Sequence, residues 1–197
     1  SAYKSSGQYK RDILIKRIDK ARQCHGRVKK QFEVVLADYS KILDAGDADI
    51  RAEYNKLNKE CKKTHAVTKE MARRVKSVQA VGKPLFRGWE DELDEYKNEK
   101  IRRTSEEQLD TTRRGYLKVV HAIKSSEDKI DDVIKSLNDQ LLFLSHNLNA
   151  KALKLFKKEV STLKTDVKSL IEQMDKAIEE TDKFVETGSV AIATPQE

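Results

Sequence analysis

Apolar residues in the first part of the chain recur at alternating intervals of four and three, the pattern of the buried seam of a coiled-coil helix. This first run consists of Leu14, Ile18, Ala21, His25, Val28, Phe32, Val35, Tyr39 and Ile42. Residues 44–47 interrupt it, and we expect Gly46 to take a left-handed conformation and Asp47 to cap the following helix. The pattern predicts a first long helix that ends near residue 44.

A second run has the same spacing and continues to Leu93 and Tyr96 after a slip of one residue. Pro84 lies within it, and a proline removes a backbone donor and clashes with the preceding turn. Because the register continues across Pro84, we predict one helix kinked there rather than two helices. The run is Ile50, Tyr54, Leu57, Cys61, Thr64, Thr68, Met71, Val75, Val78, Gly82, Leu85 and Trp89.

A third run follows a polar stretch, residues 96–104, which we interpret as a turn. Thr104 with Glu107, and Ser105 with Gln108, have the spacing of two overlapping capping boxes. These boxes predict that the third helix begins there. Its seam positions are Leu109, Thr112, Tyr116, Val119, Ile123, Ser126, Ile130, Val133, Leu137, Leu141 and Leu144.

The segment 146–149 separates the third run from a fourth. We expect Asn147 to adopt a left-handed conformation and Asn149 to cap the next helix. The fourth run is Leu153, Phe156, Val160, Leu163, Val167, Leu170, Met174, Ala177, Thr181 and Phe184. Residues 188–197 lack any period, so we predict a disordered tail after a single domain at residues 1–187.

Long helices joined by short turns pack antiparallel. The sequence therefore predicts an all-α protein, an elongated antiparallel bundle of three to four coiled-coil helices, each roughly 55–75 Å long. The longest apolar runs, such as residues 141–144, are too short to span a membrane. The chain starts at Ser1 without a methionine, and we expect an upstream segment to have been removed.

Catalytic motifs are missing from the sequence: it has no glycine-rich phosphate loop, nucleophile elbow or HExxH pair. A narrow bundle is also expected to offer no pocket that could separate the pKa values of paired carboxylates. We therefore expect no enzyme activity, no catalytic residues and no cofactor.

Two cysteines and two histidines, Cys24, His25, Cys61 and His65, are the only metal-like set. An antiparallel hairpin would place residue 25 across from about residue 67, so His25 and His65 could approach each other. The alternative is a polar layer that fixes the register, together with Thr64 and Thr68. We favour the polar layer and predict no metal site and no disulfide.

Basic residues are concentrated in the first two predicted helices, whereas acidic residues gather near residues 90–95 and 175–186. The chain has a net charge of +7. A solvated helix surface explains many such residues, but this separation also favours anionic membrane or an acidic partner. Nucleic acid is disfavoured because no recognition motif is present. The candidate binding residues are Lys16, Lys20, Arg27, Lys29, Lys30, Lys59, Lys62, Lys63, Arg73 and Arg74.

Four segments, KRDIL (10–14), YNKLN (54–58), WEDEL (89–93) and LSHNLNA (144–150), resemble a bacterial family known as domain of unknown function 2959. The resemblance extends from about residue 8 to residue 184. It implies an exported, lipoprotein-like protein of Gram-negative bacteria, with a periplasmic or outer-membrane location, and it implies no known activity. The chain departs from the family in its basic first two helices and in Pro84.

These observations lead to one main hypothesis and two alternatives. The main hypothesis is a non-catalytic scaffold protein of the cell envelope that binds anionic membrane through a basic helical face, in the manner of BAR domains. Such domains act as dimers, and the additional apolar positions Val34, Leu36, Val120, Ile134 and Ile178 could serve that purpose. The alternatives are an adaptor that binds another helical protein without lipid, and a metal-binding bundle that uses His25, Cys61 and His65.

Overall fold

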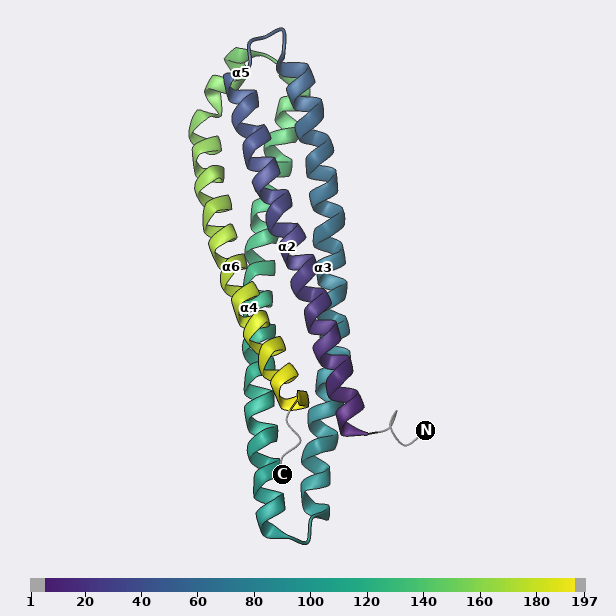
Figure 1. Ribbon diagram of the computed structural model, residues 1–197. Helices are drawn as coiled ribbons and strands as arrows, with labels where there is room; N and C mark the ends of the chain where they lie inside the picture. The colour runs from purple at the N-terminus through teal and green to yellow at the C-terminus, as the bar shows by residue number, and fades with distance from the viewer. Residues whose placement is uncertain (1–5, 194–197) are drawn as a thin grey trace.

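Long antiparallel helices form a single rod in the computed structural model, which describes residues 6–193, with side chains up to Thr187 (Figure 1). The helices are α2 (Gly7–Asp44), α3 (Ile50–Glu92), α4 (Glu99–His146), the short α5 (Ala150–Leu155) and α6 (Lys157–Ala193), with a 3₁₀ turn η1 (Leu93–Glu95) after α3. The described part of the chain contains no strand. The predicted all-α antiparallel bundle is confirmed.

The apolar seam holds the rod together. All seam positions predicted for α2 are buried, from Leu14 to Ile42, and the same holds for most seam positions of α3, α4 and α6. Tyr96 is exposed, and the half-buried exceptions are Tyr54, Thr68, Trp89, Thr112, Phe156 and Phe184. Each fully buried Leu, Ile or Val contributes ~1.5–3 kcal/mol, so the seam alone stabilises the fold substantially.

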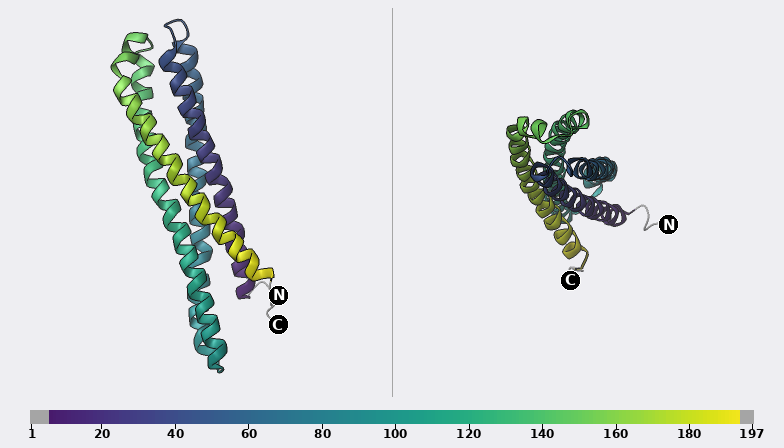
Figure 2. Two further views of the ribbon diagram at one scale, coloured as in Figure 1. Left: turned by 60° about the vertical axis from the view of Figure 1, so that its left-hand side comes forward. Right: turned by 90° about the horizontal axis from the view of Figure 1, so that it is seen from above.

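Each long helix packs against two neighbours, since α2 contacts α3 and α6, and α4 contacts the same two helices. Figure 2 shows this four-helix arrangement from above. Polar contacts also cross the core: the Tyr39 hydroxyl of α2 donates a hydrogen bond to the Gln140 side chain of α4. The α3–α4 hairpin extends beyond the start of α2 and the end of α6 (Figure 1).

The first turn differs from the prediction at two residues. No described residue has a positive φ angle, so Gly46 is not left-handed. Asp49, not Asp47, occupies the N-cap position of α3. The Asp47 carboxylate instead accepts a hydrogen bond of 2.6 Å from the backbone N–H of Ala150, at the start of α5. The helix ends at Asp44 because Ala45 is already extended.

The second turn is shorter than predicted. Helix α4 begins at Glu99, and the Asn98 side chain caps it by accepting the N–H of Ile101 at 3.1 Å. The prediction that capping boxes at Thr104 and Ser105 begin this helix was therefore wrong, because both residues lie inside it. The Ser105 hydroxyl accepts a hydrogen bond of 2.8 Å from the Trp89 indole.

The third turn confirms one cap and corrects another. Asn149 caps α5 as predicted, accepting the N–H of Ala152 at 2.8 Å. Asn147 is not left-handed; it has a φ of −140°. The predicted fourth helix is divided at Phe156, whose φ and ψ of −96° and 3° separate α5 from α6.

Helix α3 continues through Pro84, as predicted, and the kink at this residue stays a prediction. Helix α6 continues past Gly188 to Ala193, so the predicted disordered tail begins too early. The last residues of that tail, 194–197, lie outside the described part of the chain.

Candidate interaction surface

The basic face is an exposed surface on the neighbouring helices α2 and α3. On α2 its residues lie at the outer heptad positions, and on α3 they lie on the side away from the core. Their side chains are exposed to solvent. The basic face consists of Lys16, Lys20, Arg27, Lys30, Lys59, Lys62, Lys63 and Arg73.

Two cations of the basic face form ion pairs. Arg27 of α2 contacts Glu70 of α3 at 2.8 Å, and Arg74 reaches the same carboxylate at 3.4 Å. The hydrogen bond from Arg27 lowers the pKa of Glu70 below its usual value. Lys63 lies 3.1 Å from Glu60 within α3. Only the pair of Arg27 with Glu70 joins the two helices, and a partly exposed pair of this kind is worth about 0–1 kcal/mol, so it links them weakly.

The remaining cations of the basic face have no acidic partner among the described residues. They are Lys16, Lys20, Lys30, Lys59, Lys62 and Arg73. A solvated surface would usually alternate charges of both signs. Residues 10–87 instead carry 21 Lys and Arg against 10 Asp and Glu. The first helical hairpin is therefore the positively charged part of the molecule.

Lys29 lies on a different side of α2 from the basic face. Its ammonium group pairs with Asp175 of α6 at 2.5 Å, and this hydrogen bond raises the Lys29 pKa. Arg22 pairs with Asp182 of α6 at 2.7 Å in the same way. Both pairs join α2 to α6, so Lys29 contributes to a contact between helices rather than to the basic face.

The four metal-like residues do not come together. The hydroxyl of Ser126 on α4 donates to the carbonyl of Ile123 at 2.7 Å, so it accepts the Nε2–H of His25 at 3.1 Å. His65 lies 3.3 Å from the Asn138 side chain at the surface. Cys24 and Cys61 are buried free thiols. The described residues contain no group of three or more His, Cys, Asp or Glu that could hold a metal ion.

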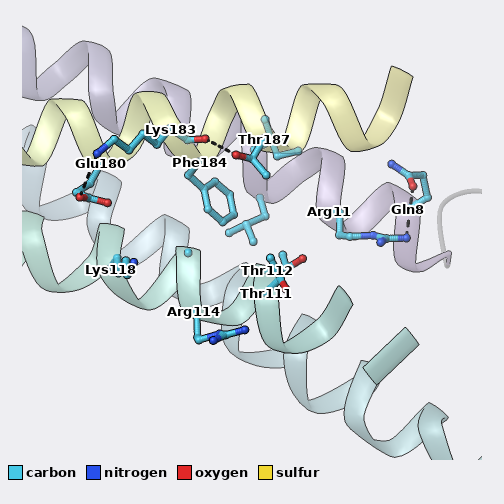
Figure 3. Close-up of a pocket in the computed structure, with 13 residues that line it drawn as sticks. Gln8, Arg11, Thr111, Thr112, Arg114, Lys118, Glu180, Lys183, Phe184 and Thr187 are labelled. Atoms are coloured by element: carbon cyan, nitrogen blue, oxygen red, sulfur yellow. Dashed lines mark hydrogen bonds and ion pairs between the residues drawn. The ribbon is translucent and has the colours of Figure 1, made fainter. Parts of the chain in front are cut away.

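A cleft of about 400 Å³ lies where the start of α2 faces α4 and the end of α6, contrary to the prediction of a bundle without a pocket (Figure 3). Phe184 points into it from α6. Gly115 on α4 makes room for this ring, because a Cβ there would lie 3.1 Å from it. Among the described residues of the lining, Glu180 is the one acid, and it lies 3.9 Å from Lys183. The described lining therefore holds one carboxylate, whereas paired acid–base catalysis uses two.

Sequence reasoning missed one exposed apolar surface. Leu142, Phe143 and Leu155 are exposed where α4, α5 and α6 meet. The apolar run of residues 141–144 could have indicated this surface, because only Leu141 and Leu144 are needed for the buried seam. Two exposed apolar residues between two seam residues indicate a helix that is apolar on its outer side as well.

The fold and surface together define an elongated helical bundle with one basic face, and no described helix is long and apolar enough to cross a membrane. The chain belongs to a family described as a protein of unknown function, DUF2959, which matches residues 1–187. Neither a curated protein nor a solved structure matches the sequence.

Proposed function

We propose that this protein is a non-catalytic scaffold of the cell envelope that binds anionic membrane through its basic face. The observation that supports the proposal most strongly is the set of six exposed cations without an acidic partner among the described residues. Ion pairing with the described residues does not neutralise them, so they are available to lipid phosphates.

The expected strength of this interaction follows from the charge count. A basic residue near an anionic membrane surface contributes ~1 kcal/mol. Six such residues would contribute about 6 kcal/mol, which corresponds to a Kd of tens of micromolar. Because the Debye length shrinks from ~10 Å at 0.1 M salt to ~3 Å at 1 M, the binding should be strongly salt-dependent.

Co-sedimentation with vesicles tests the proposal. We expect the protein to pellet with vesicles that contain phosphatidylglycerol, and to stay in solution with purely zwitterionic vesicles or at high salt. An adaptor for another helical protein would show no vesicle binding under any of these conditions, and that outcome would contradict the membrane proposal.

A BAR-like mode of action would add dimerisation and membrane curvature. The length of the rod supports it, since a helix of 48 residues such as α4 spans about 72 Å. Of the five apolar positions expected to mediate a dimer, Val34 alone is exposed; Val120 is buried, and the others are half-buried. Analytical ultracentrifugation would reveal a dimer, and electron microscopy of vesicles would reveal tubules.

A location in the periplasm or at the outer membrane is part of the same proposal. It is supported by the resemblance of the chain to exported, lipoprotein-like proteins. Fractionation of cells that express the complete gene tests it: we expect the protein with the envelope fraction. Recovery in the cytosolic fraction would contradict this location without affecting the lipid-binding proposal.

A further inference from the structure

The apolar corner is a patch of exposed apolar side chains at the end of the rod where α4, α5 and α6 meet. Leu142 of α4 is 64% exposed and Leu155 of α5 is 72% exposed. Next to them, the ring of Phe143 packs at a tilt of 60° on the ring of the half-buried Phe156, with centroids 4.4 Å apart. We define the apolar corner as these four residues. Single exposed apolar residues are ordinary, whereas a group of them in one region of the surface marks an interaction site. In this group the Phe143 and Phe156 rings are in contact, and Leu142 and Leu155 directly precede them in the sequence.

Lysines lie close to the apolar corner in the sequence. Residues 140–158, between Asp139 and Glu159, contain four lysines and no aspartate or glutamate. The four lysines are exposed, and none forms an ion pair with a described residue. They are Lys151, Lys154, Lys157 and Lys158. These lysines favour a partner that offers negative charge together with an apolar phase.

The local backbone holds the apolar corner in place. Helix α5 buries Ala152 and Leu153 against the bundle, which leaves Leu155 on its outer side. Asn149 and Asp47 both accept backbone N–H groups in the first turn of α5. The short helix is thus fixed at both its start and its inner face, so the apolar corner needs no rearrangement to reach a partner.

We propose that the apolar corner inserts into the headgroup boundary of an anionic lipid bilayer. Leu142, Leu155 and the two rings enter the acyl boundary, while the lysine side chains extend back to the lipid phosphates. The inference rests on the proposed membrane function but assigns a surface separate from the basic face. A second copy of the chain fits less well, because a symmetric contact would bring the lysines of both copies together.

A tryptophan placed at the apolar corner tests insertion directly. The chain has one tryptophan, Trp89, so the probe is Leu155→Trp in a Trp89→Phe background. Leu117 on α4, 55% exposed, provides the matched control, Leu117→Trp in the same background. With vesicles that contain phosphatidylglycerol and brominated lipid, we expect a blue shift and quenching at residue 155 and neither at residue 117. No quenching at residue 155 in bound protein would overturn the inference.

Substitution of the exposed leucines gives a second readout. Leu142→Ser with Leu155→Ser should weaken binding to anionic vesicles about tenfold or more at low salt, because apolar burial is lost. Leu117→Ser should leave binding unchanged. Equal binding by wild type and the double variant would overturn the inference while leaving the basic face intact. A wild-type dimer that the double variant converts to monomer, with vesicle binding unchanged, would assign the apolar corner to self-association instead.

Discussion

Gly82 of α3 lies directly against the ring of Tyr116 on α4, so closely that a Cβ at residue 82 would lie 2.5 Å from Cε2 of that ring. The ring has little room to move, because it also packs on Phe86, with centroids 5.1 Å apart. The absence of a side chain at this seam position therefore sets the distance between α3 and α4 in this layer.

Substitution of Gly82 by alanine should destabilise the bundle. Alanine gains about 0.5–1 kcal/mol of helix propensity over glycine, but overpacking a core costs about 1–3 kcal/mol, so we expect a net loss. The matched control is Gly26→Ala in α2, where a Cβ would meet no atom within 4 Å and propensity alone should stabilise. Urea unfolding, followed by circular dichroism, gives the free energy of unfolding of both variants. Equal stabilisation by the two substitutions would show that the contact with Tyr116 is not tight.

His25 should make the protein sensitive to mild acid. Burial lowers its pKa to about 4, and the charge of nearby Asp175 opposes the shift only in part. The unfolded chain binds this proton at about pH 6.5, so between pH 6.5 and 4 the unfolded state binds more protons and stability falls as the pH falls. A shift of this size corresponds to about 3 kcal/mol in total.

The variant His25→Leu should remove this part of the pH dependence, whereas His121→Gln, at an exposed position on α4, should keep it. The free energy of unfolding at pH 7 and pH 4.5 is the quantity to compare. Parallel curves for wild type and His25→Leu would contradict the assignment of the effect to this histidine.

The two thiols should be inert in the folded protein. Burial raises the pKa of Cys61 to about 12, and it raises the pKa of Cys24 as well. Thiolates are the reactive form, so we expect neither cysteine to react with Ellman's reagent at pH 8 until urea unfolds the chain. Lys62→Cys, which places a thiol at an exposed neighbouring position, should react at once. Rapid reaction of two thiols in the native wild type would show that the seam opens.

Much of the fold could be predicted from sequence because the seam is periodic, and period is a local property. The turns between the helices were harder to predict than the helices. Asn98 caps α4 from within a long polar stretch, where several Asn, Asp, Ser and Thr residues compete for that role. Asp47 also looked like a local cap, but its carboxylate bonds to Ala150, more than a hundred residues away in sequence. A contact of that kind leaves no periodic signal.

The candidate site was predicted only as a region. Lys29 and Lys30 are neighbours in sequence, yet Lys29 pairs with Asp175 and Lys30 faces solvent. Successive residues of an α-helix point in directions about 100° apart, so a count of basic residues in the sequence cannot tell which of the two lysines faces solvent. The apolar corner was hidden for the opposite reason, because Leu142 and Phe143 resembled a continuation of the seam.

Asp47→Ala should lower stability by about 0.5–2 kcal/mol, the usual cost of losing a capping acceptor. Asn149→Ala should cost a similar amount, since both residues accept N–H groups in the first turn of α5. Because the two act on one short helix, the double variant should cost less than the sum of the single variants. Asp47→Asn retains an acceptor oxygen and is the control. Strict additivity would show that the two acceptors act independently.

The central claim is that the position of the positive charge, and not its amount, directs the protein to membrane. The test variant reverses four cations of the basic face, namely Lys30→Glu, Lys59→Glu, Lys62→Glu and Arg73→Glu. The matched control reverses four exposed lysines of α4 and α6, namely Lys124→Glu, Lys135→Glu, Lys168→Glu and Lys176→Glu. Each reversal removes two charges, so both variants change the net charge from +7 to −1.

The most direct measurement is the partition coefficient of wild type and both variants on vesicles that contain phosphatidylglycerol, at low salt. At ~1 kcal/mol per basic residue, we expect the basic-face variant to bind at least about a hundredfold more weakly than the control variant. Equal weakening of the two variants would contradict the account, because it would show that net charge alone governs binding.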